Sequence, residues 1–305
     1  VVMDKLVEIM GEEAFRAGIQ EYLTTYAYSN ATWNDLIAIL DRRCDEDLAS
    51  FSDVWVNQRG MPHITLERKE NRLHVSECDP LGRGLHWPQT FTVDIVAGNT
   101  TTRHEVVMCG EEVTLEIGNA DYIIPNSDGR GYGLFILGDN DRAALLTHYA
   151  TIADEVTRQA TIMNLRELYE ANYISNEEWL SALISGLSTE RSALIASTLV
   201  GYVAEPLSAL RSAEAEAELY AMSQSHALVS CRQQLLRMLM QTATSADLCR
   251  ELYTLWHEAK HPLLNVNDYM TLAYELSLRF PERYDTIATT QRERITDEDR
   301  RRKFN

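Results

Sequence analysis

The period of the hydrophobic residues changes twice along this 305-residue chain, and these changes constrain the fold more than any other feature. In residues 1–58 apolar side chains recur at helical spacing, as Phe15 and Ile19 do. Between residues 59 and 138 the period becomes two, which is typical of half-buried strands. The helical period then returns over residues 139–305. The sequence therefore predicts helices, then strands, then helices again.

Turn and capping residues mark the ends of these elements. Gly11 is expected to separate the first helix from the second. Four polar residues stand three positions before an acidic residue, the spacing of a capping box that starts a helix. These pairs are Thr32 with Asp35, Ser175 with Glu178, Thr244 with Asp247, and Asn265 with Asp268.

The predicted fold class is a multidomain α and β protein. Residues 1–58 form helices, and residues 59–138, with their regular short strands, form a small antiparallel β-sandwich. Residues 139–305 form an α-helical domain, because consecutive short helices usually stack in antiparallel pairs, as in a solenoid. The sequence shows no strict repeat period, so the predicted solenoid is irregular.

Composition narrows the classes of partner. A formal net charge of −18 repels phosphate backbones, so we expect no nucleic-acid partner. The apolar runs fall short of the roughly 20 residues that span a bilayer, so we expect no membrane span. The five cysteines lie far apart without a CxxC pair and are expected to be free, buried thiols. Nothing in the sequence indicates the compartment.

One segment has the form of a zinc-binding motif. Residues 257–261 read His-Glu-Ala-Lys-His, and HExxH on a helix can place two imidazoles one turn apart on a metal. Pro262 disfavours helical backbone at His261, so we expect this histidine to leave the helix. Glu275 and Glu282 are the nearby glutamates that could supply a third ligand. The motif is therefore interpreted as a chance occurrence at a helix end.

Two further patterns have both a functional and a structural interpretation. The glycines of residues 128–133 suggest a phosphate loop, but their spacing is not GxGxxG and no helix follows, which favours a turn between strands. His63, His74 and His104 lie on the polar phase of strands and would form a metal cluster only if the fold gathered them. Solvated or capping roles are the expected ones.

Short motifs along the whole chain carry a family resemblance. Those in the first helices are Leu6 to Gly11, Phe15, Tyr22-Leu23, Tyr28 to Thr32, and Asp35-Leu36. Those in the strand region are Trp55 to Pro62 (W-x-x-Q-x-G-x-P), Trp87-Pro88, and Pro125-Asn126 through Gly131-Tyr132-Gly133. Those in the later helices are Asp154 to Arg158, Asp268-Tyr269, Leu278-Arg279 with Pro281, and Gln291 to Ile295 with Asp299-Arg300. In order and spacing they resemble the aminopeptidase N-type zinc metallopeptidase family, the gluzincin aminopeptidases.

The resemblance implies a parent enzyme in which Zn²⁺ activates water to attack the first peptide bond of a peptide substrate. The family's HExxH, distal glutamate, G-x-M-E-N loop and catalytic tyrosine all precede the position that corresponds to Val1. The resemblance therefore assigns no catalytic, cofactor-binding or metal-binding residue to this chain, and HEAKH lies in the wrong domain to be the family's motif. Zn²⁺ is expected in the parent enzyme and not in this part.

We therefore expect a fragment that carries the helical end of the catalytic domain, the β-sandwich and an incomplete helical domain. It would border the substrate cleft, pack on the catalytic domain, meet peptides through that domain, and be inactive alone. The alternatives are a non-enzymatic module that binds proteins through its sandwich and helices, and a small peptidase with HEAKH as its zinc site. Substrate preference and oligomeric state stay open.

Overall fold

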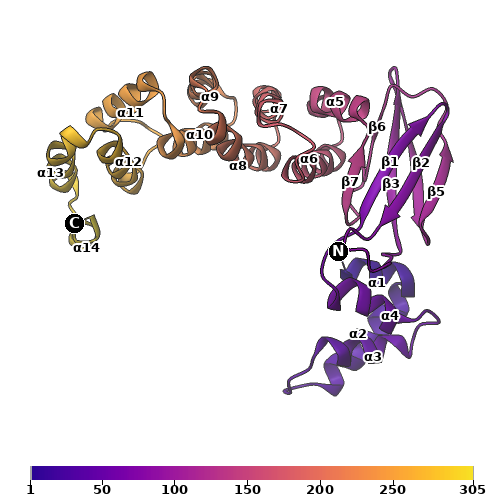
Figure 1. Ribbon diagram of the computed structural model, residues 1–305. Coiled ribbons are helices and arrows are strands. Elements are labelled where there is room, and N and C mark those ends of the chain that lie inside the picture. The colour runs from indigo at the N-terminus through magenta and orange to yellow at the C-terminus, as the bar shows by residue number, and fades with distance from the viewer. Residues whose placement is uncertain (1, 305) are drawn as a thin grey trace. The chain divides into compact units, whose positions relative to one another are not determined.

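The computed structural model describes residues 2–304 and divides into two compact units (Figure 1). The first comprises Val1–Leu145 and Val156–Leu168, and the second comprises Leu146–Glu155 and Tyr169–Asn305. Each unit is described by itself.

The first unit begins with four short helices. They are α1 (Val2–Met10), α2 (Glu12–Thr25), α3 (Trp33–Asp41) and α4 (Leu48–Ser52), and a π-helical turn follows at Asp53–Asn57. Gly11 separates α1 from α2 with a φ of 79°, as predicted. The predicted capping box at the start of α3 is also confirmed: the Thr32 hydroxyl accepts from the Asp35 amide, and the Asp35 carboxylate accepts from the Thr32 amide at 2.8 Å. Helix boundaries here follow local sequence signals.

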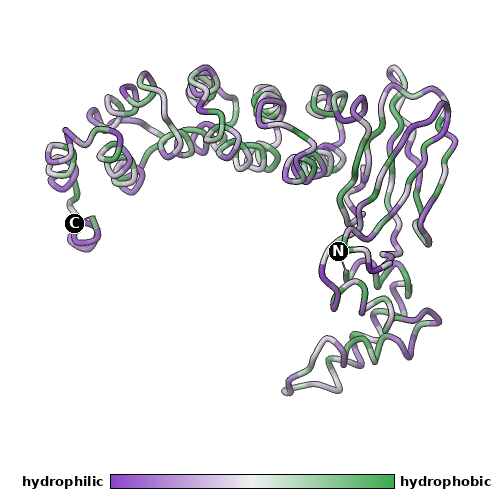
Figure 2. Tube along the Cα trace, in the orientation of Figure 1, coloured by the Kyte–Doolittle hydropathy of each residue, from purple (hydrophilic) through white to green (hydrophobic). Residues whose placement is uncertain are grey.

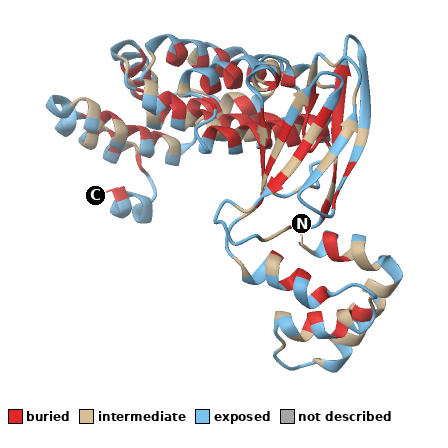
Figure 3. Ribbon diagram, turned by 45° about the vertical axis from the view of Figure 1, so that its right-hand side comes forward, coloured by how far each residue is buried: buried red, intermediate tan, exposed pale blue. Residues whose placement is uncertain are grey.

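These helices contribute unequally to the hydrophobic core that they share. Its buried residues are Leu6, Leu36, Ile37, Leu40, Leu48, Phe51, Trp55 and Trp87. Helix α2 contributes no fully buried side chain: Phe15, Ile19 and Tyr22 are half-buried, and Leu23 is 64% exposed. In Figure 3 these helices carry much tan and blue, the colours of intermediate and exposed residues. The apolar face of α2 that the sequence predicts exists, but the described chain covers it only in part.

Seven strands follow and form two sheets. They are β1 (His63–Lys69), β2 (Arg72–Cys78), β3 (Gln89–Ala97), β4 (Thr100–Met108), β5 (Glu112–Glu116), β6 (Tyr122–Ile124) and β7 (Leu134–Leu137). The first sheet has the order β5-β2-β1-β7 and the second the order β4-β3-β6. Every pair is antiparallel except β1 with β7, which is parallel, with His63 opposite Leu134. The expectation of purely antiparallel pairing is therefore wrong at this pair, because β7 reaches β1 through a long connection rather than a hairpin.

A buried aromatic contact joins the two sheets, and buried polar contacts stabilise the second sheet. Phe91 of β3 and Phe135 of β7 meet edge to face, with ring centroids 5.1 Å apart. Buried and exposed residues alternate along strands such as β2, which a half-buried strand requires. The buried carboxylate of Asp94 accepts from the Arg103 guanidinium at 2.7 and 2.9 Å and from the Ser127 hydroxyl at 2.8 Å. A buried charge of this kind is stable only when it is paired and hydrogen-bonded.

Helices account for the rest of the chain. They are α5 (Asp139–His148), α6 (Glu155–Glu170), α7 (Asn176–Thr189), α8 (Ala193–Leu210), α9 (Ala213–Ser225), α10 (Val229–Thr242), α11 (Ala246–Glu258), α12 (Val266–Arg279), α13 (Tyr284–Arg294) and α14 (Glu298–Phe304). Most of α6, Val156–Leu168, belongs to the first unit, where the Arg103 guanidinium reaches the Thr157 hydroxyl at 3.0 Å.

In the second unit neighbouring helices pack on one another: α7 on α8, α8 and α9 on α10, α11 on α12, and α12 on α13. Figure 2 shows apolar and polar residues mixed along these helices, as amphipathic helices require. The capping boxes predicted at Ser175 and Asn265 are confirmed. The one predicted at Thr244 is wrong: Ser245 is the N-cap residue of α11, without a capping hydrogen bond from its side chain, and the Thr244 hydroxyl donates to the Glu216 carboxylate at 2.9 Å.

Helix α8 bears on the expectation of no membrane span but does not overturn it. Its 18 residues are long and apolar enough to cross a membrane by length and composition, although no such segment was expected. Within the described chain 39% of this segment is buried, and Leu199 and Val203 lie on that buried side. One such helix does not by itself establish a membrane span.

The cysteines also differ from expectation: all five are free, but Cys78 and Cys109 are exposed rather than buried.

Candidate functional site

The HEAKH segment does not form a metal-binding helix face. Helix α11 ends at Glu258, and Ala259 takes a left-handed conformation with a φ of 50°. His261 therefore lies outside the helix that carries His257, as predicted from Pro262. Its backbone N–H donates to the Tyr269 hydroxyl at 2.8 Å, and its Nδ1 accepts from the Leu263 amide at 3.3 Å.

Cationic and aromatic groups surround the end of α11. The Arg294 guanidinium donates to the carbonyl oxygens of Trp256 at 2.8 Å and His257 at 2.7 Å, and lies 4.9 Å from the centre of a Trp256 ring. It satisfies carbonyls that a helix end leaves without intrahelical partners. A guanidinium at this position also disfavours a second cation beside His257. The end of α11 therefore packs against α13, which carries Arg294.

The remaining candidate ligands lie apart or are already paired. Glu275 forms an ion pair with Arg279 at 3.1 Å, and Glu282 forms one with Arg283 at 3.7 Å. In the described chain no three His, Cys, Asp or Glu side chains are placed to hold a metal ion.

The three strand histidines do not gather either. His63 lies opposite Cys78 and His74 lies opposite Glu67, toward opposite ends of the β1–β2 pair. His104 lies opposite Val93 in the other sheet. His74 shares a 3.1 Å hydrogen bond with the Thr114 hydroxyl across its strand pair. The solvated and capping roles expected from sequence fit this arrangement.

The glycine-rich segment is a packed turn between β6 and β7, as predicted. The Asn126 side-chain oxygen accepts from the Gly131 amide at 2.7 Å, and the Gln89 side chain accepts from and donates to the backbone of Tyr132 at 2.8 and 2.9 Å. A methyl group at Gly131 would lie 2.7 Å from the Phe135 ring, and one at Gly133 would lie 2.7 Å from the Pro62 carbonyl oxygen. The glycines permit close packing and leave no room for a phosphate.

The same turn ties the first helices to the sheets. Arg130 forms an ion pair with Glu8 of α1. One turn earlier on α1, the buried Lys5 ammonium donates to the Thr90 carbonyl of β3 at 2.8 Å and to Glu8 at 3.0 Å. The Trp55 ring also contacts the Tyr132 ring, with centroids 5.5 Å apart. Helix α1 and the second sheet are therefore held together by specific polar and aromatic contacts.

An apolar pocket of about 630 Å³ lies beside this junction and has no counterpart in the sequence motifs. Ile9, Leu48, Phe51, Val54, Leu85 and Pro88 are its apolar lining residues. His86 and Cys109 add polar atoms. Behind His86, the buried Glu77 carboxylate accepts from the Trp87 amide at 2.8 Å, and burial raises the pKa of Glu77. Only the fold brings these segments together, so no local signal could have predicted the pocket.

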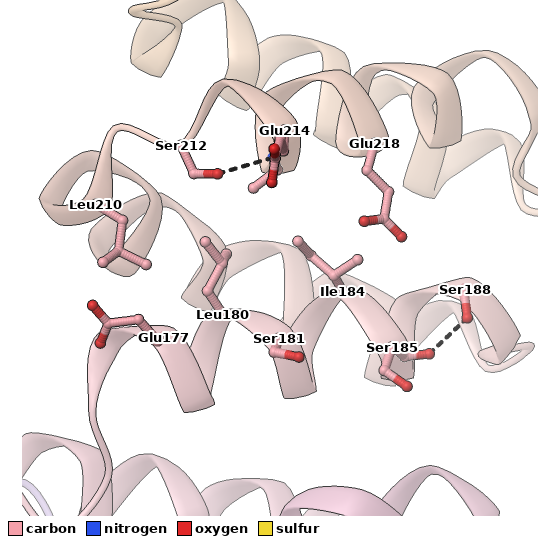
Figure 4. Close-up of a pocket in the computed structure, with 11 residues that line it drawn as sticks. Glu177, Leu180, Ser181, Ile184, Ser185, Ser188, Leu210, Ser212, Glu214 and Glu218 are labelled. Carbon is pink, nitrogen blue, oxygen red and sulfur yellow. Dashed lines mark hydrogen bonds between the residues drawn. The ribbon is translucent and has the colours of Figure 1, made fainter.

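A second hollow lies between α7 and α9 in the other unit (Figure 4) and has a volume of about 650 Å³. Leu180, Ile184, Leu210 and Ala215 provide its apolar surface, and Ser181, Ser185, Ser188 and Ser212 add hydroxyls. The acidic side chains of Glu177, Glu214 and Glu218 complete the lining. We call this hollow the acidic groove. Sequence analysis identified the helices that form it but not the groove itself.

Comparison with known proteins gives one consistent family. Residues 1–55 match the family described as "Peptidase family M1 domain". The alanine/arginine aminopeptidase of Saccharomyces cerevisiae is 25% identical over 209 residues, which cover 67% of this chain and 24% of the relative. Aminopeptidase N of Streptomyces lividans is 21% identical over 62% of this chain and 25% of its own length. Aminopeptidase N of Lactococcus lactis is 32% identical over 25% of this chain and 9% of its own length. The chain thus spans about a quarter or less of these relatives.

Proposed function

We propose that the chain belongs to the M1 peptidase family and is part of a zinc-dependent aminopeptidase that removes N-terminal residues from peptides. The agreement of two comparisons carries the proposal. The family match over residues 1–55 and the alignment to the yeast alanine/arginine aminopeptidase, which extends over two thirds of the chain, name the same class of enzyme. Relatives that are peptidases favour this function over a non-enzymatic interaction module.

We propose that the chain contributes three parts to this enzyme. Residues 1–58 would be the helical end of the catalytic domain, residues 59–138 a β-sandwich, and residues 139–305 a solenoid-like helical domain. The change from helix to strand at His63 and back to helix at Asp139 supports this division. The contact between Phe91 and Phe135 supports a sandwich, and the pairwise packing of α7 to α13 supports a helical stack.

The residues described here do not fit a catalytic zinc ion. The two histidines of HEAKH are separated by the end of α11, and Arg294 lies against the carbonyl of His257. We therefore place the zinc and the catalytic groups in polypeptide that the relatives have beyond the matched quarter of their length. On this proposal the present chain borders the cleft and is inactive alone.

The open face of α2 supports this arrangement. Phe15, Ile19 and Tyr22 are only half-buried, and Leu23 is largely exposed. Apolar side chains aligned on one helix face are normally covered by other protein. The rest of a catalytic domain would cover them, and packing on that domain is the intramolecular contact that we propose.

Zinc content and hydrolysis of aminoacyl-anilides test the proposal. The 305-residue chain is compared with a chimaera in which the preceding part of the yeast alanine/arginine aminopeptidase is joined to Val1. Zinc binding and cleavage by the chimaera alone would support the proposal. Both properties in the shorter chain would make HEAKH an active site and overturn it.

A further inference from the structure

Strand β4 gives the second sheet a long and regular edge. It pairs with β3 at every position from Thr100, opposite Ala97, to Met108, opposite Gln89, without a bulge. In the order β4-β3-β6 it is the last strand, so within residues 2–304 its second edge joins no further strand of the sheet. The backbone N–H and C=O groups along such an edge can pair with another extended chain.

The sequence of β4 favours such pairing. The strand contains no proline or lysine, two residues that commonly protect an exposed edge. Its β-branched residues, which suit extended backbone, are Thr100, Thr101, Thr102, Val106 and Val107. The Val107 side chain is 47% exposed, so an added strand would also cover apolar surface.

The charged residues of β4 make the strand complementary to a second copy of itself. Arg103 and Glu105 stand on either side of His104, and their side chains project from the same face of the sheet. If two β4 strands pair antiparallel with His104 opposite His104, each Arg103 lies opposite Glu105 of the second copy. The same register places Thr101 opposite Val107.

Charge also favours this register over its neighbours. Opposite charges at directly opposed positions attract one another, whereas like charges repel. Sliding one strand by two residues would place either Arg103 opposite Arg103 or Glu105 opposite Glu105. The register centred on His104 avoids both repulsions and makes both attractive contacts.

We propose that β4 is a dimerisation strand, through which two copies of the chain join antiparallel around a twofold axis at His104. The two three-stranded sheets then form one continuous sheet of six strands. Twofold pairing presents the same surface on both copies, so the contact between Arg103 and Glu105 forms twice. The proposal concerns the first unit alone and does not rest on aminopeptidase activity.

The existing contacts of Arg103 are compatible with this role. Its guanidinium donates to the Asp94 carboxylate at 2.7 and 2.9 Å, which fixes the side chain on the outer face of the sheet. The side chain is nevertheless 49% exposed. Because a guanidinium carries several N–H donors, it can contact a second carboxylate without leaving the first.

Sedimentation velocity of the 305-residue chain tests the proposal. Mass action predicts a shift from monomer to dimer as the concentration rises from about 1 to about 100 μM. Glu105→Arg places two arginines opposite each other at both contacts and should raise the dimer dissociation constant about tenfold or more. Its matched control is Glu112→Arg, the same charge change at an exposed position of β5, which should leave the constant within about twofold.

A chain that stays monomeric throughout this range would overturn the proposal. Equal weakening in the two variants would do so as well, because the effect would then be one of net charge. A dimer that Glu105→Arg leaves intact would assign the contact to another surface. An unchanged midpoint of urea unfolding shows that each variant is folded.

Disulfide cross-linking tests the register separately, in a background in which the exposed Cys78 and Cys109 are replaced by serine. His104→Cys should link two copies under mild oxidation, because opposed residues on paired strands bring their Cβ atoms within about 5 Å. Thr100→Cys, at the exposed start of the same strand, should give no more linked dimer than the background, since it would lie opposite Met108. Equal linkage at both positions, or a dimer that does not link at residue 104, would overturn the pairing through β4.

Discussion

The phenol oxygen of Tyr149 occupies the space that a side chain at Gly186 would need. This hydroxyl donates to the Ala182 carbonyl at 2.9 Å, and Tyr149 is 2% exposed. A methyl group at Gly186 would lie 1.9 Å from the oxygen. Helix α7 can therefore approach Tyr149 only because residue 186 has no side chain.

Gly186→Ala is expected to destabilise the second unit by about 2 kcal/mol, because the buried tyrosine must move and its hydrogen bond is lost. The midpoint of urea unfolding measures the effect. Gly201→Ala is the matched control, since a methyl group there meets nothing within 4 Å and alanine favours a helix. Equal midpoints for the two variants would contradict the packing seen at Tyr149.

Glu216 should make stability depend on pH. Its carboxylate is buried and accepts from the Thr244 amide at 2.7 Å, the Thr244 hydroxyl at 2.9 Å and the Ser245 amide at 2.9 Å. Burial alone would raise the pKa of Glu216, but the hydrogen bonds from Ser245 and Thr244 more than offset it, so the pKa is lowered. Because the pKa is lowered in the folded state, the ionised carboxylate stabilises the fold at pH values above the ordinary pKa of a glutamate, near 4.5.

Glu216→Gln should therefore lower the free energy of unfolding by about 1.5 to 3 kcal/mol at neutral pH. The difference from the unchanged chain should shrink as the pH falls below about 4.5 and through the lowered pKa. Urea unfolding at a series of pH values measures it. Glu251→Gln, at an exposed position, should change stability by less than about 0.5 kcal/mol. A difference that persists unchanged in acid would show that shape, not charge, is what Glu216 contributes.

Lys5 is expected to hold α1 against the second sheet. Lys5→Met removes the donor to the Thr90 carbonyl and leaves that oxygen without its partner, which costs about 1 to 3 kcal/mol. Faster amide hydrogen exchange in α1, relative to β1 and β2, is the expected result. The control is Lys69→Met, because the Lys69 side chain is 59% exposed and its ammonium pairs with Glu67. A uniform change across the first unit would instead indicate global destabilisation.

The parts of the fold that sequence predicted are those set by neighbours along the chain. Three capping boxes, the break at Gly11 and the changes in hydrophobic period depend on residues within a turn or two of one another. The failures involve distant residues. Thr244 does not cap α11 as predicted, because it donates hydrogen bonds to the carboxylate of Glu216, 28 positions earlier in the sequence. Strand β7 reaches β1 in parallel, and α2 meets too little protein to bury its apolar face.

For the candidate sites too, the sequence predicted what neighbouring residues determine and missed what distant residues determine. Pro262 predicted correctly that His261 leaves the helix, because a proline restricts the residue before it. The acidic groove has no linear signature, since Glu177 and Glu218 come from helices whose separation depends on how α7 and α9 pack. The pocket near His86 likewise requires α1, α4 and the segment after β2 to meet.

HEAKH should be dispensable for catalysis. In the active chimaera, His257→Ala and His261→Ala are each expected to leave zinc content unchanged and kcat/KM for an aminoacyl-anilide within about twofold, since neither imidazole contacts a metal site in this geometry. Arg294→Ala is the informative contrast: it frees the carbonyls of Trp256 and His257 and should lower the free energy of unfolding by about 1.5 to 3 kcal/mol. Loss of zinc in either histidine variant, with folding intact, would return the metal site to α11.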